Sequence, residues 1–401
     1  MPSNSPHVKK LPQPLIDILL PVRNGAPFLA QAIESIRAQT EQSWRLLILD
    51  DGSTDQSAKI AKKFAGKDRR IRLVRYPARG LIATLNAGLK LCRAPFVARQ
   101  DADDISFPGR LAAELDYLRR NRKCIAVSGG GKTIDQKGLK AGNAWFHNPH
   151  LADPFWVPAR EPYLSHPFLM MRREIYQRLG YRNFFISEDA DLCWRLQETG
   201  KIHSLREPLG YYRAFENSVS TRIAVNTRIQ AVVSQLAAIA ARRRRARRGD
   251  LNLDRRLYAR MVKANDIEAI VEIFRSRLTS EEFLYLRKAS IIKLLMITTY
   301  RPSKVNLHEA RLAYRELHAI ARSQRSGRDS IFQICSDAHR TLRQRGQYET
   351  ARELAPGFWG WLIVARKQRW LLLFLPSPKE KGDSLLGSRP SYLRVQRQSR
   401  C

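Results

Sequence analysis

The stretch Arg99–Arg110, RQDADDISFPGR, decides how the rest of the chain is interpreted. It follows an apolar run over residues 94–98 that predicts a strand, and a helix is expected to begin where it ends. Asp101 and Asp103 are two residues apart, so at a strand end both side chains lie on one side of the backbone. Two carboxylates placed in this way suit Mg2+ or Mn2+ and, through the metal, a diphosphate. Taken alone, an acidic loop that caps the following helix is the simpler interpretation.

The sequence around this stretch alternates between apolar runs typical of buried strands and amphipathic stretches typical of helices. This alternation predicts an α/β fold with a doubly wound, mostly parallel sheet, in which ligands bind beyond the carboxyl ends of the strands. Five polar residues fall at expected strand ends: Asn24, Asp50, Asp51, Asp101 and Asp103. We expect strands over 15–22, 44–49, 71–75, 96–98 and 125–128, and helices over 27–38, 81–91, 110–121 and 173–179, with a further helix that Ser53 or Thr54 caps and that ends near residue 64.

The second half of the chain has a different character. From about residue 221 strand signals largely vanish, and stretches such as 223–240 and 307–323 have helical apolar spacing, with the arginine-rich run 242–248 between them. We therefore expect a sheet-containing domain and a helical appendage. The expected boundaries are a disordered tail over 1–14, the sheet-containing domain over 15–222, a basic helical region over 223–380 and a disordered basic tail over 381–401.

The net charge of the 401-residue chain is +34, and residues 221–401 hold 37 basic and 15 acidic residues. Such an excess attracts polyanions, which include nucleic acid, anionic lipid and phosphorylated substrates. The five cysteines are scattered and have no metal-ligand spacing, the first 14 residues do not form a secretory signal, and no apolar run reaches 18 residues. These features favour a protein of the reducing cytoplasm.

Two nucleotide-binding motifs can be set aside by spacing. The run Gly129–Thr133 looks like the end of a phosphate-binding P-loop, but Ala126 stands where the first glycine is required. A dinucleotide-binding fingerprint needs three glycines after the first strand, and only Gly25 is there.

A third set of motifs occurs in order: Pro21-Val22-Arg23-Asn24, Asp50–Asp55, Asn86-Ala87-Gly88, Ala98–Asp104 with Pro108, and Glu188-Asp189 with Arg195-Leu196. This set resembles the family 2 glycosyltransferases of the GT-A fold over roughly residues 15–220. His166-Pro167 ahead of Met170 is similar to members that build bacterial surface polysaccharides. The resemblance implies a nucleotide-sugar donor, which in this family is commonly UDP-linked, and a divalent metal. It also implies inversion at the anomeric carbon and a glycan or lipid-linked acceptor.

The resemblance also implies residue roles. Asp189 is the expected general base, because an acceptor hydroxyl must lose its proton in the transition state, and Glu188 would orient it or bind an acceptor hydroxyl. The plainer alternative for this pair is an acidic first turn favoured by the helix dipole. Asp101 and Asp103 are the expected metal ligands. The expected nucleotide-sugar-binding residues are Pro21, Val22, Asn24, Asp50, Asp51, Asn86, Arg99 and Asp101.

One departure from the family concerns the segment 211–218. Members often carry a histidine there, whereas this chain holds Phe215 at the matching place, so the family's histidine contact to the metal or diphosphate does not carry over to this sequence. We expect Arg213 as a substitute contact to phosphate.

Two stretches rich in aromatic residues leave their alternatives open. Those within 138–164 can stack on a sugar or pack beneath a long loop. The segment 358–375, with Trp359, Trp361 and Trp370 beside basic residues, suits either the headgroup region of an anionic membrane or a buried helix. A peripheral position on the inner face of the cytoplasmic membrane would suit a lipid-linked acceptor. The competing function is nucleic-acid binding through the basic C-terminal half, although no named reader module is found there.

Overall fold

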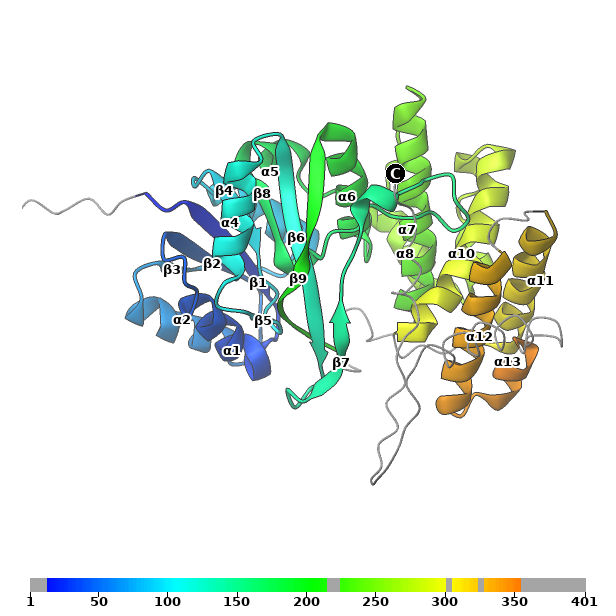
Figure 1. Ribbon diagram of the computed structural model, residues 1–401, viewed down its shortest axis with the longest axis horizontal. Helices are drawn as coiled ribbons and strands as arrows, with labels where there is room; N and C mark the ends of the chain where they lie inside the picture. Colours follow the sequence, from blue (N-terminus) through cyan, green and yellow to red (C-terminus); the bar gives the residue numbers. More distant parts are fainter. Residues whose placement is uncertain (1–12, 215–223, 301–304, 324–327, 355–401) are drawn as a thin grey trace, which may run out of the picture. The chain divides into compact units, whose positions relative to one another are not determined.

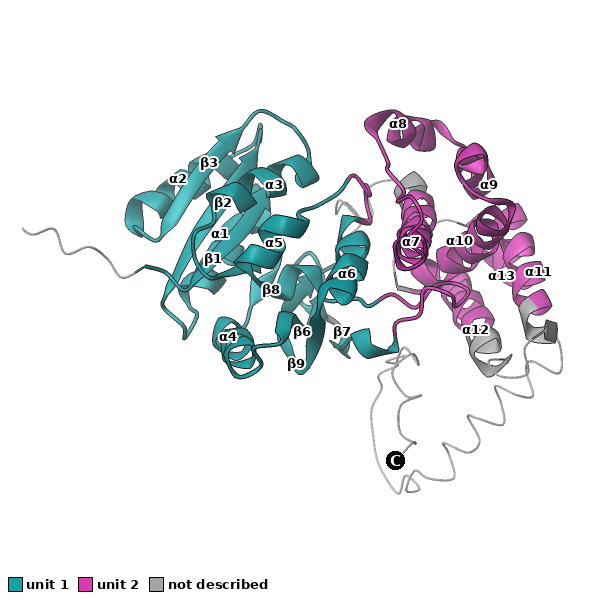
Figure 2. Ribbon diagram, turned by 90° about the horizontal axis from the view of Figure 1, so that it is seen from above, with its two compact units in different colours: residues 1–151, 162–182, 188–214 teal, residues 152–161, 183–187, 215–401 magenta. Residues whose placement is uncertain are grey.

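The structure is a computed structural model that describes residues 13–214, 224–300, 305–323 and 328–354. It divides into two compact units (Figure 2). Unit 1 comprises residues 1–151, 162–182 and 188–214, and unit 2 comprises 152–161, 183–187 and 215–401. The expected boundary at 222 therefore falls within the undescribed residues 215–223, and two short segments inside the expected sheet-containing domain belong to unit 2.

Unit 1 is built on a nine-stranded mixed sheet (Figure 1). The order is β3-β2-β1-β4-β8-β6-β9-β5, and β7 pairs with β6. β3, β2, β1 and β4 are parallel, β8 runs antiparallel to both β4 and β6, and β9 is parallel to β6. The expected mostly parallel sheet is thus confirmed. The strands are β1 (Ile16–Val22), β2 (Trp44–Asp51), β3 (Ile71–Tyr76), β4 (Phe96–Arg99), β5 (Ile105–Ser106), β6 (Cys124–Ile134), β7 (Lys140–Trp145), β8 (Leu169–Arg172) and β9 (Lys201–Arg213).

Both faces of the sheet are covered by helices, which explains why every residue of β1 is buried. Alternate side chains of the strand serve opposite faces: Ile18 packs in the cluster that contains Leu29 and Leu115, and Leu19 packs in the cluster that contains Leu85. α1 (Ala26–Arg37), α2 (Ser57–Lys67) and α4 (Arg110–Arg120) supply the first face, and α3 (Leu81–Leu91), α5 (Arg173–Leu179) and α6 (Glu188–Thr199) the second.

Two local expectations are wrong. Neither Ser53 nor Thr54 caps α2, which begins at Ser57 with Gln56 at its N-cap. The strand expected over 125–128 continues to Ile134 through three glycines. A Cβ on Gly130 would lie 2.0 Å from the carbonyl oxygen of Trp145. The glycine run therefore permits close strand packing, and it does not form a phosphate-binding loop.

Unit 2 is helical, and its described helices are α7 (Ala224–Arg245), α8 (Arg255–Lys263), α9 (Ile267–Glu272), α10 (Ser280–Tyr300), α11 (Leu307–Ser323), α12 (Arg328–Gln344) and α13 (Tyr348–Glu353). α7 packs against α10, and a buried ion pair, Arg228 to Glu309 at 2.5 Å, joins α7 to α11. The first four arginines of the basic run form the last turn of α7. The tryptophan-containing segment 358–375 lies outside the described residues.

Candidate functional site

The loops after β1 and β2 are joined by hydrogen bonds. The Asn24 backbone N–H donates to Ser53 Oγ at 3.0 Å, and Asn24 Oδ1 accepts from the Thr54 N–H at 2.8 Å. Asn24 has φ +54°, a left-handed conformation that asparagine tolerates better than most residues. Pro21 and Val22 are buried at the end of β1, where Val22 is in register with Asp50 of β2. The predicted donor-binding residues of β1 and β2 therefore meet at one sheet edge.

Asp50 and Asp51 organise the loops that follow them. Asp50 accepts from the Ser53 N–H at 2.9 Å and from Arg75 Nε at 3.1 Å. Asp51 accepts from the N–H groups of Arg79 and Gly80, at 2.8 and 3.0 Å, and from the Thr84 hydroxyl at 2.8 Å. Both carboxylates are buried, so these charge-assisted hydrogen bonds compensate their desolvation. Their expected contacts with a nucleotide stay a prediction.

At the end of β4, Arg99 Nη2 lies 2.6 Å from Asp101 Oδ1. Residues behind this pair hold the backbone: Gln100 Nε2 donates to the carbonyl oxygens of Asp101 and Asp104, both at 3.0 Å. Arg110 Nη1 in turn donates to Gln100 Oε1 at 3.0 Å, and Arg110 Nη2 donates to the Arg99 carbonyl oxygen at 2.6 Å. Burial raises the pKa of Glu114, which pairs with Arg110, to about 7. The acidic stretch is thus fixed from beneath by a buried polar network.

Arg213, at the end of β9, braces the same stretch. Its backbone N–H donates to Asp104 Oδ1 at 2.8 Å, and its Nε donates to the Asp103 carbonyl oxygen at 2.9 Å. Its Nη2 donates to Gln31 Oε1 at 2.7 Å. The structure thus gives this guanidinium structural partners where a phosphate contact was expected. Phe215 and the remainder of that segment lie outside the described residues.

The acidic residues that follow β4 interact electrostatically with those that begin α6. Burial, and then the neighbouring charge of Asp101, raises the pKa of Asp103 to about 7. Burial and the charge of Asp189 raise the pKa of Glu188 to about 8, with a further contribution from Asp101. A contribution of this kind falls with distance. The charge of Asp101, a predicted metal ligand, therefore reaches Glu188 of the predicted catalytic pair.

The first turn of α6 is anchored by the residues that follow it. Asp191 accepts from Arg195 Nε at 2.8 Å and from Arg182 Nε at 3.1 Å. Arg195 also donates to the carbonyl oxygens of Leu179 and Gly180, at 2.7 and 2.9 Å. These bonds explain why the motif contains Arg195. This arginine fixes the helix that begins with Glu188 and Asp189.

A buried cluster behind Arg99 was not expected from the sequence. His166 Nε2 lies 2.6 Å from the Tyr181 hydroxyl, which also contacts the Tyr176 hydroxyl. Burial, and then the Arg99 charge, lowers the pKa of His166 to about 3, so its ring is neutral. Asn86 holds the backbone of Tyr181 from both sides: its Nδ2 donates to the carbonyl oxygen and its Oδ1 accepts from the N–H, both at 2.8 Å. The His166-Pro167 motif thus contributes to a polar layer beneath the site.

The carboxylates of this site suit a divalent cation, because burial and the charge of Asp101 raise the pKa of Asp103, and a cation would stabilise its charged form. In the part of the chain that the structure describes, no group of three or more His, Cys, Asp or Glu side chains could hold a metal ion by itself. Mg2+ is typically bound by one or two carboxylates together with water and substrate phosphates. Asp101 and Asp103 fit that mode, in which the diphosphate completes the ligand set.

Comparisons with known proteins identify the family of the chain. The model of "Glycosyl transferase family 2" matches residues 17–180. The chain is 33% identical over 212 residues to EpsE of Bacillus subtilis (strain 168), a provisionally assigned glycosyltransferase, and this match covers 51% of the chain and 74% of EpsE.

Two larger relatives are matched only in part. Chondroitin synthase of Escherichia coli is 27% identical over 201 residues, which are 48% of this chain and 28% of the synthase. The O-antigen biosynthesis protein RfbC of Myxococcus xanthus is 30% identical over 223 residues, which are 52% of this chain and 16% of RfbC. Among solved structures, the mannosyltransferase PcManGT of Pyrobaculum calidifontis, in complex with GDP-Man and Mn2+, matches at 15% identity with a TM-score of 0.47, covering 90% of this chain and 88% of that one.

Proposed function

This chain belongs to glycosyl transferase family 2, and from that membership we propose that it moves a sugar from a UDP-linked donor to an acceptor hydroxyl with inversion at the anomeric carbon. One observation carries the proposal: Asp101, in the loop after β4, lies close enough to the start of α6 to raise the pKa of Glu188. One group can serve the leaving diphosphate and the other the incoming hydroxyl. Nucleic-acid binding, the competing function, finds no support among these relatives.

The donor side consists of Asp101, Asp103 and Arg99. Arg99 already pairs with Asp101, whereas the raised pKa of Asp103 marks a carboxylate that gains most from a cation. We assign Asp103 as the principal ligand and Asp101 as the second. A bound Mg2+ or Mn2+ would neutralise the charge that develops on the diphosphate. Pro21, Val22, Asn24, Asp50 and Asp51 surround the nucleoside from the neighbouring strand ends.

The acceptor side consists of Glu188 and Asp189. Asp189 takes the proton of the acceptor hydroxyl as its oxygen bonds to the anomeric carbon and the bond to the diphosphate breaks. A single displacement of this kind inverts the configuration and needs one base. Glu188, which holds its proton up to about pH 8, can donate a hydrogen bond to another acceptor oxygen.

The names of two relatives support a proposal for the acceptor. An O-antigen biosynthesis protein and a chondroitin synthase both concern polysaccharides. We therefore propose a growing cell-surface polysaccharide, free or lipid-linked, as the acceptor.

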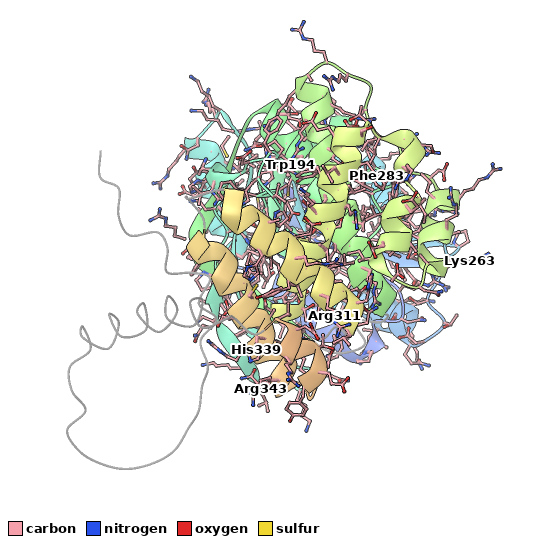
Figure 3. All side chains as sticks on the ribbon, turned by 90° about the vertical axis from the view of Figure 1, so that its right-hand side faces the viewer. Trp194, Lys263, Phe283, Arg311, His339 and Arg343 are labelled. Atoms are coloured by element: carbon pink, nitrogen blue, oxygen red, sulfur yellow. The ribbon has the colours of Figure 1, made fainter. Side chains whose placement is uncertain are left out.

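A lipid-linked acceptor would place the protein on the inner face of the cytoplasmic membrane, and unit 2 offers a suitable surface. Among the described helices, none is long and apolar enough to cross a membrane. α8 buries Leu257 and Met261 and exposes Arg256, Arg260 and Lys263, the last of which projects at the edge of Figure 3. Cations on one helix face attract anionic headgroups.

Flotation with phosphatidylglycerol vesicles tests this location. Charge reversal at Arg256, Arg260 and Lys263 should weaken binding. Reversal at Lys59, Lys62 and Lys63, which are equally exposed on α2 of unit 1, should not. Equal binding by both triple variants would exclude α8 as the membrane contact. Removal of residues 355–401 tests the tryptophan segment in the same assay.

A thermal-shift screen of UDP- and GDP-linked sugars, with Mn2+ and with EDTA, tests the function itself. We expect one UDP-sugar to raise Tm with Mn2+ and not with EDTA. Release of UDP from that donor should then depend on an added glycoside acceptor. A chain that no nucleotide-sugar stabilises, with or without metal, would contradict the proposal.

A further inference from the structure

Tyr163 contacts the proposed base, although the sequence singles out no role for it there. Its hydroxyl donates to Asp189 Oδ2 at 3.0 Å. The other oxygen, Asp189 Oδ1, accepts from the Ala190 N–H at 2.8 Å. Both residues belong to unit 1 and both are half-buried. The two hydrogen bonds fix the plane of the Asp189 carboxylate.

The backbone around Tyr163 is tied to the elements that carry the site. The Leu164 N–H donates to the sulfur of Cys193 on α6 at 3.5 Å, and the Ser165 N–H donates to Ser128 Oγ on β6 at 3.0 Å. The ring of Tyr163 packs edge-on against His147, with centroids 4.6 Å apart. Contacts to the backbone and to the ring thus fix the position of the Tyr163 hydroxyl. Little further side-chain entropy is lost when this hydroxyl orients Asp189.

A hydrogen bond of this type separates two otherwise similar carboxylates. Glu188 and Asp189 are adjacent, and each charge opposes the ionisation of the other. A donor directed at one carboxylate favours the charged form of that carboxylate. The hydrogen bond from Tyr163 therefore favours the ionised form of Asp189, which is the form that a base needs.

We propose that Tyr163 is a positioning residue that orients the Asp189 carboxylate as the base. The inference rests on the proposed transferase function and extends it to a residue outside the motifs. In the reaction Asp189 accepts the acceptor's proton, the acceptor oxygen bonds to the anomeric carbon, and the diphosphate leaves. Tyr163 neither gains nor loses a proton overall.

Tyr163→Phe tests the proposal because it removes the hydroxyl and keeps the ring against His147. The matched control is Tyr117→Phe on α4, whose ring stacks on His203 with centroids 4.4 Å apart. Donor turnover is measured as UDP release from the UDP-sugar that the thermal screen identifies, with a glycoside acceptor. We expect Tyr163→Phe to lower kcat roughly ten- to a hundredfold, as is typical when an orienting partner is lost, with donor KM and Tm close to wild type. Tyr117→Phe should leave kcat and KM unchanged.

A double-mutant cycle with Asp189→Asn separates the two claims. If Tyr163 acts through Asp189, then Tyr163→Phe has no further effect in the Asp189→Asn background. Wild-type kcat in Tyr163→Phe, together with loss of transfer in Asp189→Asn, would overturn the role of Tyr163 and leave the proposed function intact. A full additional loss in the double variant would also overturn it. Normal transfer by Asp189→Asn would instead overturn the base assignment, and the role of Tyr163 with it.

Discussion

Arg99 and Asp101 form an ion pair of 2.6 Å in which the arginine side chain is 1% exposed and the aspartate side chain 29% exposed. Burial has the largest single effect and lowers the pKa of Arg99, but the charge of Asp101, its hydrogen bond and the nearby Tyr181 and Tyr176 together outweigh burial, so the pKa is raised. Asp101, the first acidic residue of the stretch, therefore already interacts with the buried Arg99 guanidinium. Its neighbour Asp103, two residues on, keeps a raised pKa. The two carboxylates are alike in sequence and different in their electrostatic role.

Arg99→Gln should destabilise the protein, because it removes the cation that compensates Asp101. Loss of one partner from a fully buried pair costs about 3–5 kcal/mol, and the partial exposure of Asp101 reduces this to roughly 1–3 kcal/mol. Urea unfolding measures the change. The control is Arg120→Gln, which breaks an exposed pair with Asp116 on α4 and should cost under about 0.5 kcal/mol. An equal decrease in the free energy of unfolding in the two variants would show that the Arg99–Asp101 pair stabilises the fold no more than an exposed pair does.

Asp103→Asn should alter the pH dependence of metal binding and of stability. The pKa of Asp103 in the folded state, about 7, lies above the usual value for an aspartate. Between about pH 4 and 7 the folded state therefore binds a proton that the unfolded state has lost. The free energy of unfolding consequently falls as pH rises through that range. Metal-free Asp103→Asn should therefore be more stable than wild type at pH 8, by roughly 1–2 kcal/mol because the side chain is partly solvated, and no more stable at pH 4.

Calorimetric titration of Mn2+ in the presence of UDP gives the second readout for Asp103. Mn2+ competes with the proton, so affinity in the wild type should rise up to about pH 7 and then level off. In Asp103→Asn the affinity should be low and nearly independent of pH. An unchanged Mn2+ affinity in this variant would remove Asp103 from the ligand set.

Gly130→Ala should disrupt the hairpin of β6 and β7, because its Cβ would meet the Trp145 carbonyl oxygen at 2.0 Å. We expect the free energy of unfolding, measured with a chemical denaturant, to fall by about 1–3 kcal/mol, as for other overpacked positions. The control, Gly66→Ala on α2, places its Cβ where nothing lies within 4 Å and should cause no loss. A stable Gly130→Ala protein would show that the strands can separate at little cost.

Much of unit 1 could be predicted from the sequence, because its strands are continuous apolar runs and its helices have a clear apolar stripe. α3 and α5 of unit 1 have the expected ends, as does α11 of unit 2. The continuation of β6 could not be predicted, since three successive glycines usually signal a turn, and the close approach of Leu209 to Gly129 and of Trp145 to Gly130 and Gly131 arises only in the folded chain.

The motifs identified the candidate site, and its supporting residues escaped detection for a physical reason. Asn86 reaches the backbone of Tyr181 across 95 residues, and Tyr163 reaches Asp189 across 26. Such pairs are created by tertiary packing and leave no local spacing. A tyrosine in an aromatic-rich loop was an available signal, but it did not distinguish packing from a role at the base.

Asp189→Asn tests the central claim most directly, since the amide preserves the shape of the side chain and cannot accept the acceptor's proton. The measurement is a pair: donor binding by thermal shift with the UDP-sugar and Mn2+, and transfer by UDP release with a glycoside acceptor. The account predicts a donor-induced Tm shift close to that of wild type and transfer reduced at least about a hundredfold. Transfer at the wild-type rate, with donor binding intact, would contradict it.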